Sequence, residues 1–238
     1  MKSRRLHAWD VTPREAIQIQ QSLRSHVILH GRVPSPKLVA GADLSYEKNS
    51  DTVYASVVVL KFPSLEIVEA LALKTRASFP YIPGLLSFRE APPLLRAFGR
   101  LRSQPELIFI DGHGRSHPRA AGLACHVGLL LDRPVIGCAK SRLVGTFKEP
   151  GRGRGSTSWL YNPDGQTIGA VLRTRDRVKP MFISVGHRIG LRQAIRLTLA
   201  CGTRYRVPEP TRQADALADQ AKRLRRSINI TGQERDRG

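Results

Sequence analysis

The sequence predicts an α/β fold in which helices flank a mixed central sheet, and two observations lead to this prediction. Three successive segments, 37–46, 52–62 and 66–74, have the composition of strands and are joined by short turns, which is typical of an antiparallel three-stranded meander. Two later apolar runs, 107–110 and 134–139, enclose a helical segment, as expected for a parallel β-α-β unit. The 238 residues suffice for one large domain with a hydrophobic core.

The first predicted element is a helix that begins after Thr12 and continues to about residue 30. Thr12 and Glu15 have the spacing of a capping box, and Pro13 occupies the first helical position. Gly31 and Pro34 should end this helix. The meander then follows and completes the first part of the predicted sheet.

The remaining elements continue the alternation of helix and strand. A helix should begin at Ala91, directly after Glu90, and reach about Arg102. The later elements are a helix at 118–131, a hairpin of 159–161 and 167–172, a strand at 181–185, and helices at 191–200 and after Pro210. We expect one domain over residues 1–225 and a basic, disordered tail over residues 226–238.

The charge of the chain indicates a polyanionic partner, and we expect this partner to be nucleic acid. Lysine and arginine number 39 against 19 aspartate and glutamate residues, which gives a formal net charge of +20. No apolar run is long enough to span a membrane, and the N-terminal segment lacks the apolar core of a secretory signal. The three cysteines have no metal-binding spacing, so we expect reduced thiols and a cytoplasmic protein.

Carboxylates mark the candidate catalytic site. Asp111 ends a buried apolar strand, where a carboxylate is costly unless it is paired or binds metal. Asp43 lies among small residues in a predicted strand, Glu90 lies at a helix start, and Asp215 lies on a late helix. Each carboxylate also has a structural interpretation when it is considered alone. Asp111 could be a turn or cap residue, and Asp43 could face solvent. Glu90 could be an acidic residue at a helix N-terminus, where the helix dipole favours negative charge.

Carboxylates that lie close together would repel a polyanion, so they would not increase the affinity of a strongly basic protein for it. If these carboxylates do lie close together, the best explanation is a binding site for a divalent metal ion. Mg²⁺ is bound by one or two carboxylates together with phosphate oxygens, and it supports in-line displacement at phosphorus. The predicted strand order is also that of the ribonuclease-H-like fold, in which carboxylates meet at the sheet centre. This agreement favours a metal-dependent reaction over the separate structural interpretations.

Two loops could contact nucleic acid directly. Pro80 and Pro83 stiffen Tyr81 and Ile82 into an extended projection, which suits insertion into a base stack. The alternative is a tyrosine that packs its loop onto the core. The basic loop 151–156 is either a mobile loop that follows a phosphate backbone or a linker.

Six segments of the sequence resemble motifs of endonuclease V, the deoxyinosine-specific nuclease of DNA repair. The similarity covers about residues 10–225, and the string PYIPGLLSFRE is highly specific to that family. The segments are GADLSY at 41–46, PYIPGLLSFRE at 80–90, DGHG through HP at 111–118, CAKS at 138–141, ISVGHR at 183–188 and PTRQAD at 210–215.

The resemblance implies roles for individual residues. Asp43 and Asp111 would bind Mg²⁺, with Mn²⁺ as a substitute, and Glu90 would complete the catalytic carboxylates. Asp215 would lie in the outer part of the site. His117 would act in catalysis, and both His117 and Lys140 would contact phosphate. The residues implied in DNA binding are the wedge Tyr81, Ile82 and Pro83, the base pocket Gly84, Leu86 and Gly112, and Lys140.

The implied activity is hydrolysis of the second phosphodiester bond 3′ to deoxyinosine, leaving a 3′-hydroxyl and a 5′-phosphate. Two alternatives stay open: an endoribonuclease specific for inosine in RNA, and a non-catalytic nucleic-acid-binding protein with the same surface. The expected partner is DNA that contains deoxyinosine, or RNA that contains inosine, with no membrane association. We expect a monomer.

Overall fold

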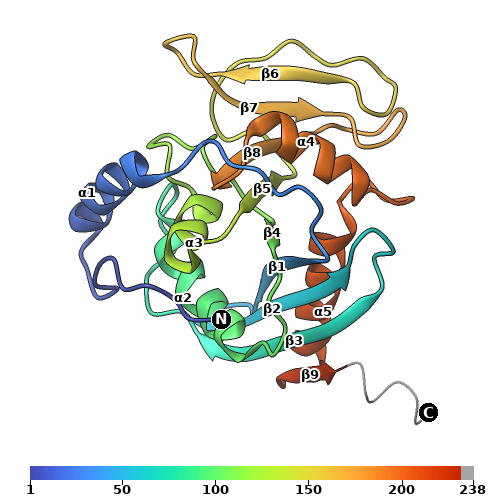
Figure 1. Ribbon diagram of the computed structural model, residues 1–238. Coiled ribbons are helices and arrows are strands. Elements are labelled where there is room, and N and C mark those ends of the chain that lie inside the picture. Colours follow the sequence, from blue (N-terminus) through green and yellow to red (C-terminus); the bar gives the residue numbers. More distant parts are fainter. Residues whose placement is uncertain (232–238) are drawn as a thin grey trace.

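A nine-stranded mixed sheet runs through the protein, with the strands in the order β6-β7-β8-β5-β4-β1-β2-β3-β9 (Figure 1). The computed structural model describes residues 1–231. Strand β1 pairs in parallel with β4, and β4 pairs in parallel with β5, whereas the other neighbours are antiparallel. The strands are β1 (Leu38–Tyr46), β2 (Thr52–Lys61), β3 (Ile67–Arg76), β4 (Leu107–Ile110), β5 (Val135–Ala139), β6 (Thr157–Tyr161), β7 (Thr167–Leu172), β8 (Met181–His187) and β9 (Ile228–Thr231). This arrangement confirms the predicted meander and parallel unit of a ribonuclease-H-like fold.

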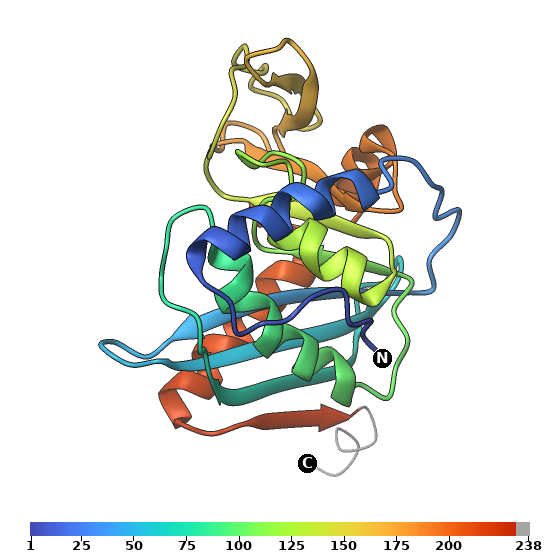
Figure 2. The ribbon, with the colours of Figure 1, turned by 90° about the vertical axis from the view of Figure 1, so that its left-hand side faces the viewer.

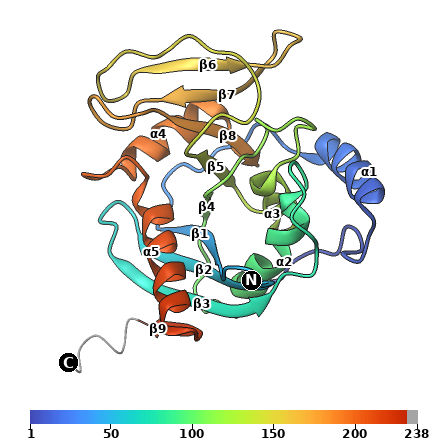
Figure 3. The same ribbon diagram turned by 180° about the vertical axis from the view of Figure 1, so that it is seen from behind.

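Helices cover both faces of this sheet. Their bounds are α1 (Pro13–Leu23), α2 (Leu86–Arg100), α3 (Leu123–Leu131), α4 (Leu191–Ala200) and α5 (Glu209–Leu224). Helices α2 and α3 pack on one face, and α1 lies outside them (Figure 2). Helix α5 runs along the opposite face of β1, β2 and β3 (Figure 3). None of the helices in residues 1–231 combines the length and apolar character needed to cross a lipid bilayer.

Alternating side chains of the central strands form the two cores. Ile108 and Ile110 of β4 are fully buried on the side of α2 and α3. Leu107 and Phe109 are fully buried on the side of α5. Because β4 is covered on both faces, its sequence is continuously apolar. Asp111 comes next and therefore marks the point where this strand leaves the core.

Three helix boundaries differ from the sequence prediction for local reasons. Helix α1 has the predicted capping box, but it ends at Leu23 and continues only as a 3₁₀ turn over Arg24–His26. Helix α2 begins at Leu86 instead of Ala91, because a turn at 82–85 starts it, and Glu90 therefore lies inside the helix. Helix α3 begins at Leu123 instead of residue 118, since successive turns occupy 115–120.

Part of the tail predicted to be disordered forms a strand, and the basic loop at 151–156, predicted to be either a mobile loop or a linker, makes specific hydrogen bonds. Residues 228–231 form β9 and pair with β3, so the prediction of disorder was wrong there, and residues 232–238 lie outside the described part. The loop at 151–156 is fixed by hydrogen bonds. Arg173 donates to the carbonyl oxygens of Pro150 and Gly151, and Arg154 N donates to Asp176.

The close contact between β1 and α5 depends on Gly41. A Cβ atom at this position would lie 1.9 Å from the carbonyl oxygen of Pro210 and 2.6 Å from the backbone nitrogen of Thr211. The start of α5 therefore lies directly on the backbone of β1. Because α5 packs so closely on β1, side chains of α5 lie next to the residues that follow Gly41 in the strand.

We expect Gly41→Ala to lower the free energy of unfolding by about 1–3 kcal/mol or more, because the backbone of α5 must move away from β1. Gly99→Ala, in helix α2, is the matched control. A Cβ atom at Gly99 would have the carbonyl oxygen of Met1 as its nearest neighbour, at 3.8 Å, which is an ordinary contact distance. Denaturant titration of both variants measures the difference. An unchanged stability of Gly41→Ala would contradict the packing described here.

Candidate active site

Two aspartates from adjacent parallel strands form the centre of the site. Asp43 lies on β1, and Asp111 directly follows β4, where its backbone N–H donates to Ala42 O at 3.2 Å. The Asp43 carboxylate accepts a hydrogen bond from the backbone N–H of Leu44 at 2.8 Å. Burial raises the pKa of Asp43 well above its ordinary value, and the charge of Asp111 raises that pKa further. The sheet thus holds two carboxylates where both are costly to ionise without a cation.

Lys140 supplies positive charge to this pair. It follows β5, and its Nζ lies 2.5 Å from Asp111 Oδ2 and 3.5 Å from Asp215 Oδ2. Burial alone would lower the pKa of Lys140, but its hydrogen bond to Asp111 and the neighbouring carboxylates raise that pKa overall. Arg206 donates a hydrogen bond to the carbonyl oxygen of Lys140, which fixes the backbone there. Lys140 is therefore a charged lysine that bridges a strand end and α5.

Glu90 reaches the site from helix α2, which packs on the face of the sheet opposite α5. The hydroxyl of Tyr46, at the end of β1, donates to Glu90 Oε1 at 2.9 Å. Burial raises the pKa of Glu90 to about 7. The guanidinium of Arg89 lies 5.3 Å from the centre of the Tyr46 ring and packs against it. Glu90 is consequently poised between its neutral and charged forms close to neutral pH.

The carbonyl oxygen of Gly84 joins three segments of the chain. It accepts hydrogen bonds from Gln20 Nε2 at 3.2 Å, from His117 Nε2 at 3.1 Å, and from the guanidinium of Arg119 at 2.5 Å. Gln20 is buried on α1, and it also donates to Ser87 Oγ. These bonds hold the loop before α2 against the loop that follows Asp111.

His117 uses both ring nitrogens in this contact. Its Nδ1 accepts from the backbone N–H of Arg119 at 3.2 Å, so Nε2 carries the proton that it donates to Gly84 O. Burial lowers the pKa of His117 to about 4, and its ring is neutral at neutral pH. In this structure the ring therefore links the two loops. The catalytic role and the phosphate contact expected for His117 stay predictions.

A cavity of about 280 Å³ lies between these loops and next to the carboxylates. Its lining includes both Glu90 and Asp111. Five residues expected to bind DNA also line it: Tyr81, Pro83, Gly84, Leu86 and Gly112. Tyr81 is 69% exposed, so its ring projects outward instead of packing onto the core. Ile82 is different, because it packs against the apolar cluster around Phe88.

Sequence reasoning missed three residues that shape the site. Gln20 and Arg119 hold the loops around the cavity, and Tyr46 donates to Glu90. Gln20 follows the polar pattern of an exposed helix face, and no local signal marks it as buried. Tyr46 stood inside a motif that the sequence analysis quoted, and its position at a strand end beside Asp43 was an available signal.

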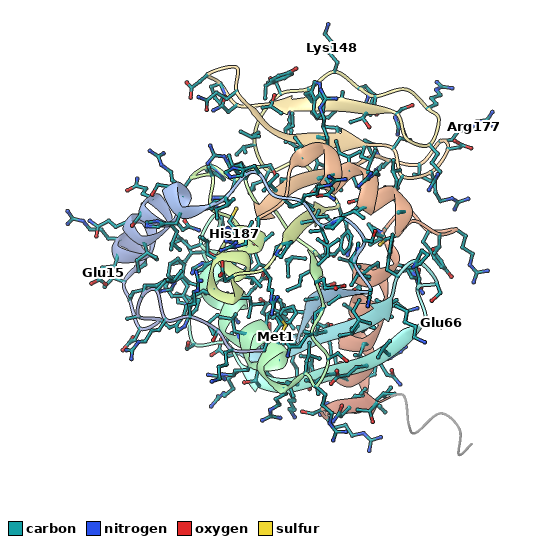
Figure 4. All side chains as sticks on the ribbon, in the orientation of Figure 1. Met1, Glu15, Glu66, Lys148, Arg177 and His187 are labelled. Carbon is teal, nitrogen blue, oxygen red and sulfur yellow. The ribbon has the colours of Figure 1, made fainter. Side chains whose placement is uncertain are left out.

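Basic side chains lie on the surface beside the β6–β7 hairpin and on α5. Lys148 and Arg177, in loops beside the β6–β7 hairpin, point away from the body of the protein (Figure 4). Arg212 is held by two hydrogen bonds to Glu209, and its guanidinium lies 4.4 Å from the centre of the Tyr205 ring. A surface of this kind is suited to a phosphate backbone.

The donor atoms at the site suit a hard divalent cation. Asp43 and Asp111 offer carboxylate oxygens in a buried position, and Lys140 already balances part of their charge. Within residues 1–231, no group of three or more His, Cys, Asp and Glu side chains forms a ready metal cluster. Two carboxylates supplemented by phosphate oxygens of a substrate agree with the ligand preference of Mg²⁺.

A ribonuclease-H-like sheet with buried carboxylates at its centre, in a chain this basic, defines a nuclease. The family model of endonuclease V matches residues 21–216, and the chain belongs to this family. The endonuclease V of Gloeobacter violaceus is 45% identical over 231 residues, which are 95% of this chain and 93% of that protein. Nucleases of this family depend on metal.

Solved structures of the family agree with this fold. The crystal structure of endonuclease V from Streptomyces avermitilis has 41% sequence identity and a TM-score of 0.87, and the match covers 94% of this chain and 99% of that chain. The enzyme from Ciona intestinalis has 27% identity and a TM-score of 0.80, with coverage of 89% and 98%. That enzyme was crystallised with a DNA that contains an inosine followed by a ribo-adenosine.

The depressed pKa of His117 predicts a pH-dependent contribution to stability. Its pKa is about 4 in the folded protein against an ordinary 6.5, so the unfolded chain binds a proton that the folded protein does not bind between these values. The stabilisation is complete above pH 6.5 and is lost as the pH falls toward 4.

We therefore expect the stability difference between the wild type and His117→Asn to shrink from pH 7 to pH 4.5 by roughly 1–3 kcal/mol. Denaturant titrations at both pH values measure it. His30→Asn, at an exposed histidine, is the control and should show no such change. A constant difference for His117→Asn would contradict the neutral, buried ring.

Proposed function

We propose that this protein is a DNA repair endonuclease that cuts strands containing deoxyinosine at the second phosphodiester bond 3′ to the lesion. The observation that carries the proposal is the buried pair Asp43 and Asp111, bridged to Lys140, beside a cavity of about 280 Å³. Membership of the endonuclease V family and the inosine-containing complex of the Ciona enzyme support the substrate. We expect it to act as a cytoplasmic monomer.

In this proposal, Asp43 and Asp111 hold the divalent cation, which is Mg²⁺ or alternatively Mn²⁺. When bound, such a cation makes water a stronger nucleophile and stabilises charge on the phosphate. Glu90, with its pKa of about 7, accepts the proton that the attacking water loses. Attack forms a new bond to phosphorus and breaks the bond between phosphorus and the 3′ oxygen. The departing 3′ oxygen takes a proton from solvent, so the products are a 5′-phosphate and a 3′-hydroxyl.

Lys140 and Asp215 act at the edge of this reaction. The ammonium group of Lys140 is half-exposed and can donate to a phosphate oxygen while it stays near Asp111. Asp215 binds Lys140 from α5 and sets the direction in which the ammonium points. His117 acts indirectly, because it holds the two loops that border the scissile phosphate and the cavity.

The cavity accommodates the base after it leaves the helix. Backbone at Gly84 and Gly112, with Pro83 and Leu86, borders a space that suits a flipped hypoxanthine. Flipping costs a few kcal/mol and is least costly for a weakly paired base. Tyr81, on its exposed loop, fills the gap that the base leaves, and Ile82 anchors that loop to the core.

Inosine-containing RNA is the second candidate substrate. The observation in its favour is that the Ciona enzyme was crystallised with a ribo-adenosine after the inosine. Comparing a deoxyinosine duplex with an inosine-containing RNA, each with Mg²⁺ and with EDTA, distinguishes the two. Cutting of RNA alone would move the function to RNA metabolism.

We expect Asp43→Asn to reduce cutting of a deoxyinosine duplex in Mg²⁺ by at least about a thousandfold, since a charged ligand is lost. Binding of the same duplex should persist. Glu66→Gln, at an exposed carboxylate in the turn between β2 and β3, is the control and should cut normally (Figure 4). Full activity of Asp43→Asn would refute the assigned metal site.

We expect Tyr81→Ala to weaken binding and cutting of a deoxyinosine duplex by about tenfold to a hundredfold, because nothing then supports the opened stack. Tyr81→Phe keeps the ring and should retain most of the activity. The measurement is kcat/KM for both variants on one duplex. If alanine and phenylalanine behave alike, Tyr81 is not a wedge.

A further inference from the structure

A long groove leads away from the cavity and is not used by the proposed reaction. It consists of two adjoining cavities, of about 830 Å³ and 680 Å³, which share Arg115 and Ile168. The larger one is bordered by His117, which also lines the 280 Å³ cavity. The groove therefore begins behind the proposed base pocket and continues toward the β6–β7 hairpin. Figure 2 shows this hairpin above helix α1.

The groove is positively charged. Among residues 1–231, four arginines and one aspartate line its two parts: Arg24, Arg115, Arg119, Arg192 and Asp164. Three different segments contribute these arginines, namely the 3₁₀ turn after α1, the loop after Asp111 and the start of α4. An excess of positive charge from separate segments along one groove indicates a polyanion that lies along it.

Aromatic side chains line the far end of the groove. Trp159 and Tyr161 lie two residues apart on β6, which is the edge strand of the sheet, so both face the same side. Leu160, between them, is fully buried on the other side. The guanidinium of Arg192 lies 5.7 Å from the Trp159 ring centre, and Tyr161 is 37% exposed. Its backbone is fixed by two hydrogen bonds of 2.9 Å to Thr146.

We propose that this groove binds a single-stranded stretch of the inosine-containing strand, outside the base pocket. The proposal rests on the proposed function for the position of the strand. Arginines suit its phosphates, and the two rings suit unpaired bases, which stack on aromatic faces regardless of sequence. A base-paired duplex would keep its bases away from Trp159 and Tyr161, so the pairing state of the flanking nucleotides should matter.

Binding in EDTA tests this proposal without cutting. Fluorescence anisotropy should show that Tyr161→Ala and Arg192→Ala weaken binding of an unmodified single-stranded oligonucleotide, by about fivefold or more each. The affinity for the matching duplex should change by less than about twofold, which is the range expected for an ordinary surface substitution. Arg196→Ala, one turn further along α4 and exposed outside the groove, is the matched control.

A second readout uses tryptophan fluorescence. The chain has two tryptophans, Trp9 and Trp159, and Trp9→Phe leaves Trp159 as the reporter. Single-stranded DNA should quench this emission, and duplex should not. An unchanged affinity of both variants, an absence of quenching, or an equal loss of affinity for single strand and duplex would overturn the proposal.

The two proposals fail in different ways. If the wild type does not cut a deoxyinosine duplex in Mg²⁺, the proposed function is wrong. Selective loss of single-strand binding by Tyr161→Ala would still support the groove in that case. If the wild type cuts the duplex but Tyr161→Ala binds single strands normally, only the groove assignment is wrong.

Discussion

The burial of two like charges on adjacent strands is the constraint on which the site depends. Asp43 and Asp111 lie side by side because β1 and β4 are parallel neighbours, and burial makes both difficult to ionise. An isolated pair of this kind would be destabilising. Lys140 from the next strand offsets part of this cost, and in the proposed reaction a bound divalent cation would offset the remainder. The excess negative charge of Asp43 and Asp111 therefore lowers the stability of the fold and, in the proposed reaction, attracts the divalent cation.

A second organising feature is the carbonyl oxygen of Gly84, at which three donors converge. His117 is one of these donors, and its two hydrogen bonds hold the ring between the loop before α2 and the loop after Asp111. In the proposed reaction these rigid loops would hold the flipped base in one position, and preorganisation of this kind contributes directly to the rate of a positioned reaction. Helix α1 carries none of the carboxylates, yet its Gln20 helps to position Gly84 and Ser87, which line the pocket.

The sequence predicted most of the fold, because its strands are separated by clear turn residues and β4 is apolar throughout. The carboxylates Asp43, Glu90 and Asp111 were candidates because acidic residues are conspicuous in apolar segments and at strand ends. The structure brings them together, and their catalytic roles stay predictions. Gln20 was not a candidate, because its burial arises from packing between distant loops. The end of α1 and the start of α2 depend on local turns that compete with helix propensity. Strand β9 was missed because its partner, β3, lies more than 150 residues earlier in the chain.

Strand β9 has a consequence beyond the nuclease site. It covers part of the outer edge of β3, pairing with Glu69, Ala70, Leu71 and Ala72. An uncovered edge strand offers its unpaired backbone to other chains, and proteins commonly protect such edges. A chain shortened at Arg225 would keep every residue of the proposed catalytic site but expose this edge. The shortened protein would then self-associate through the exposed edge of β3. Its use would be limited by low solubility and not by a loss of catalytic residues.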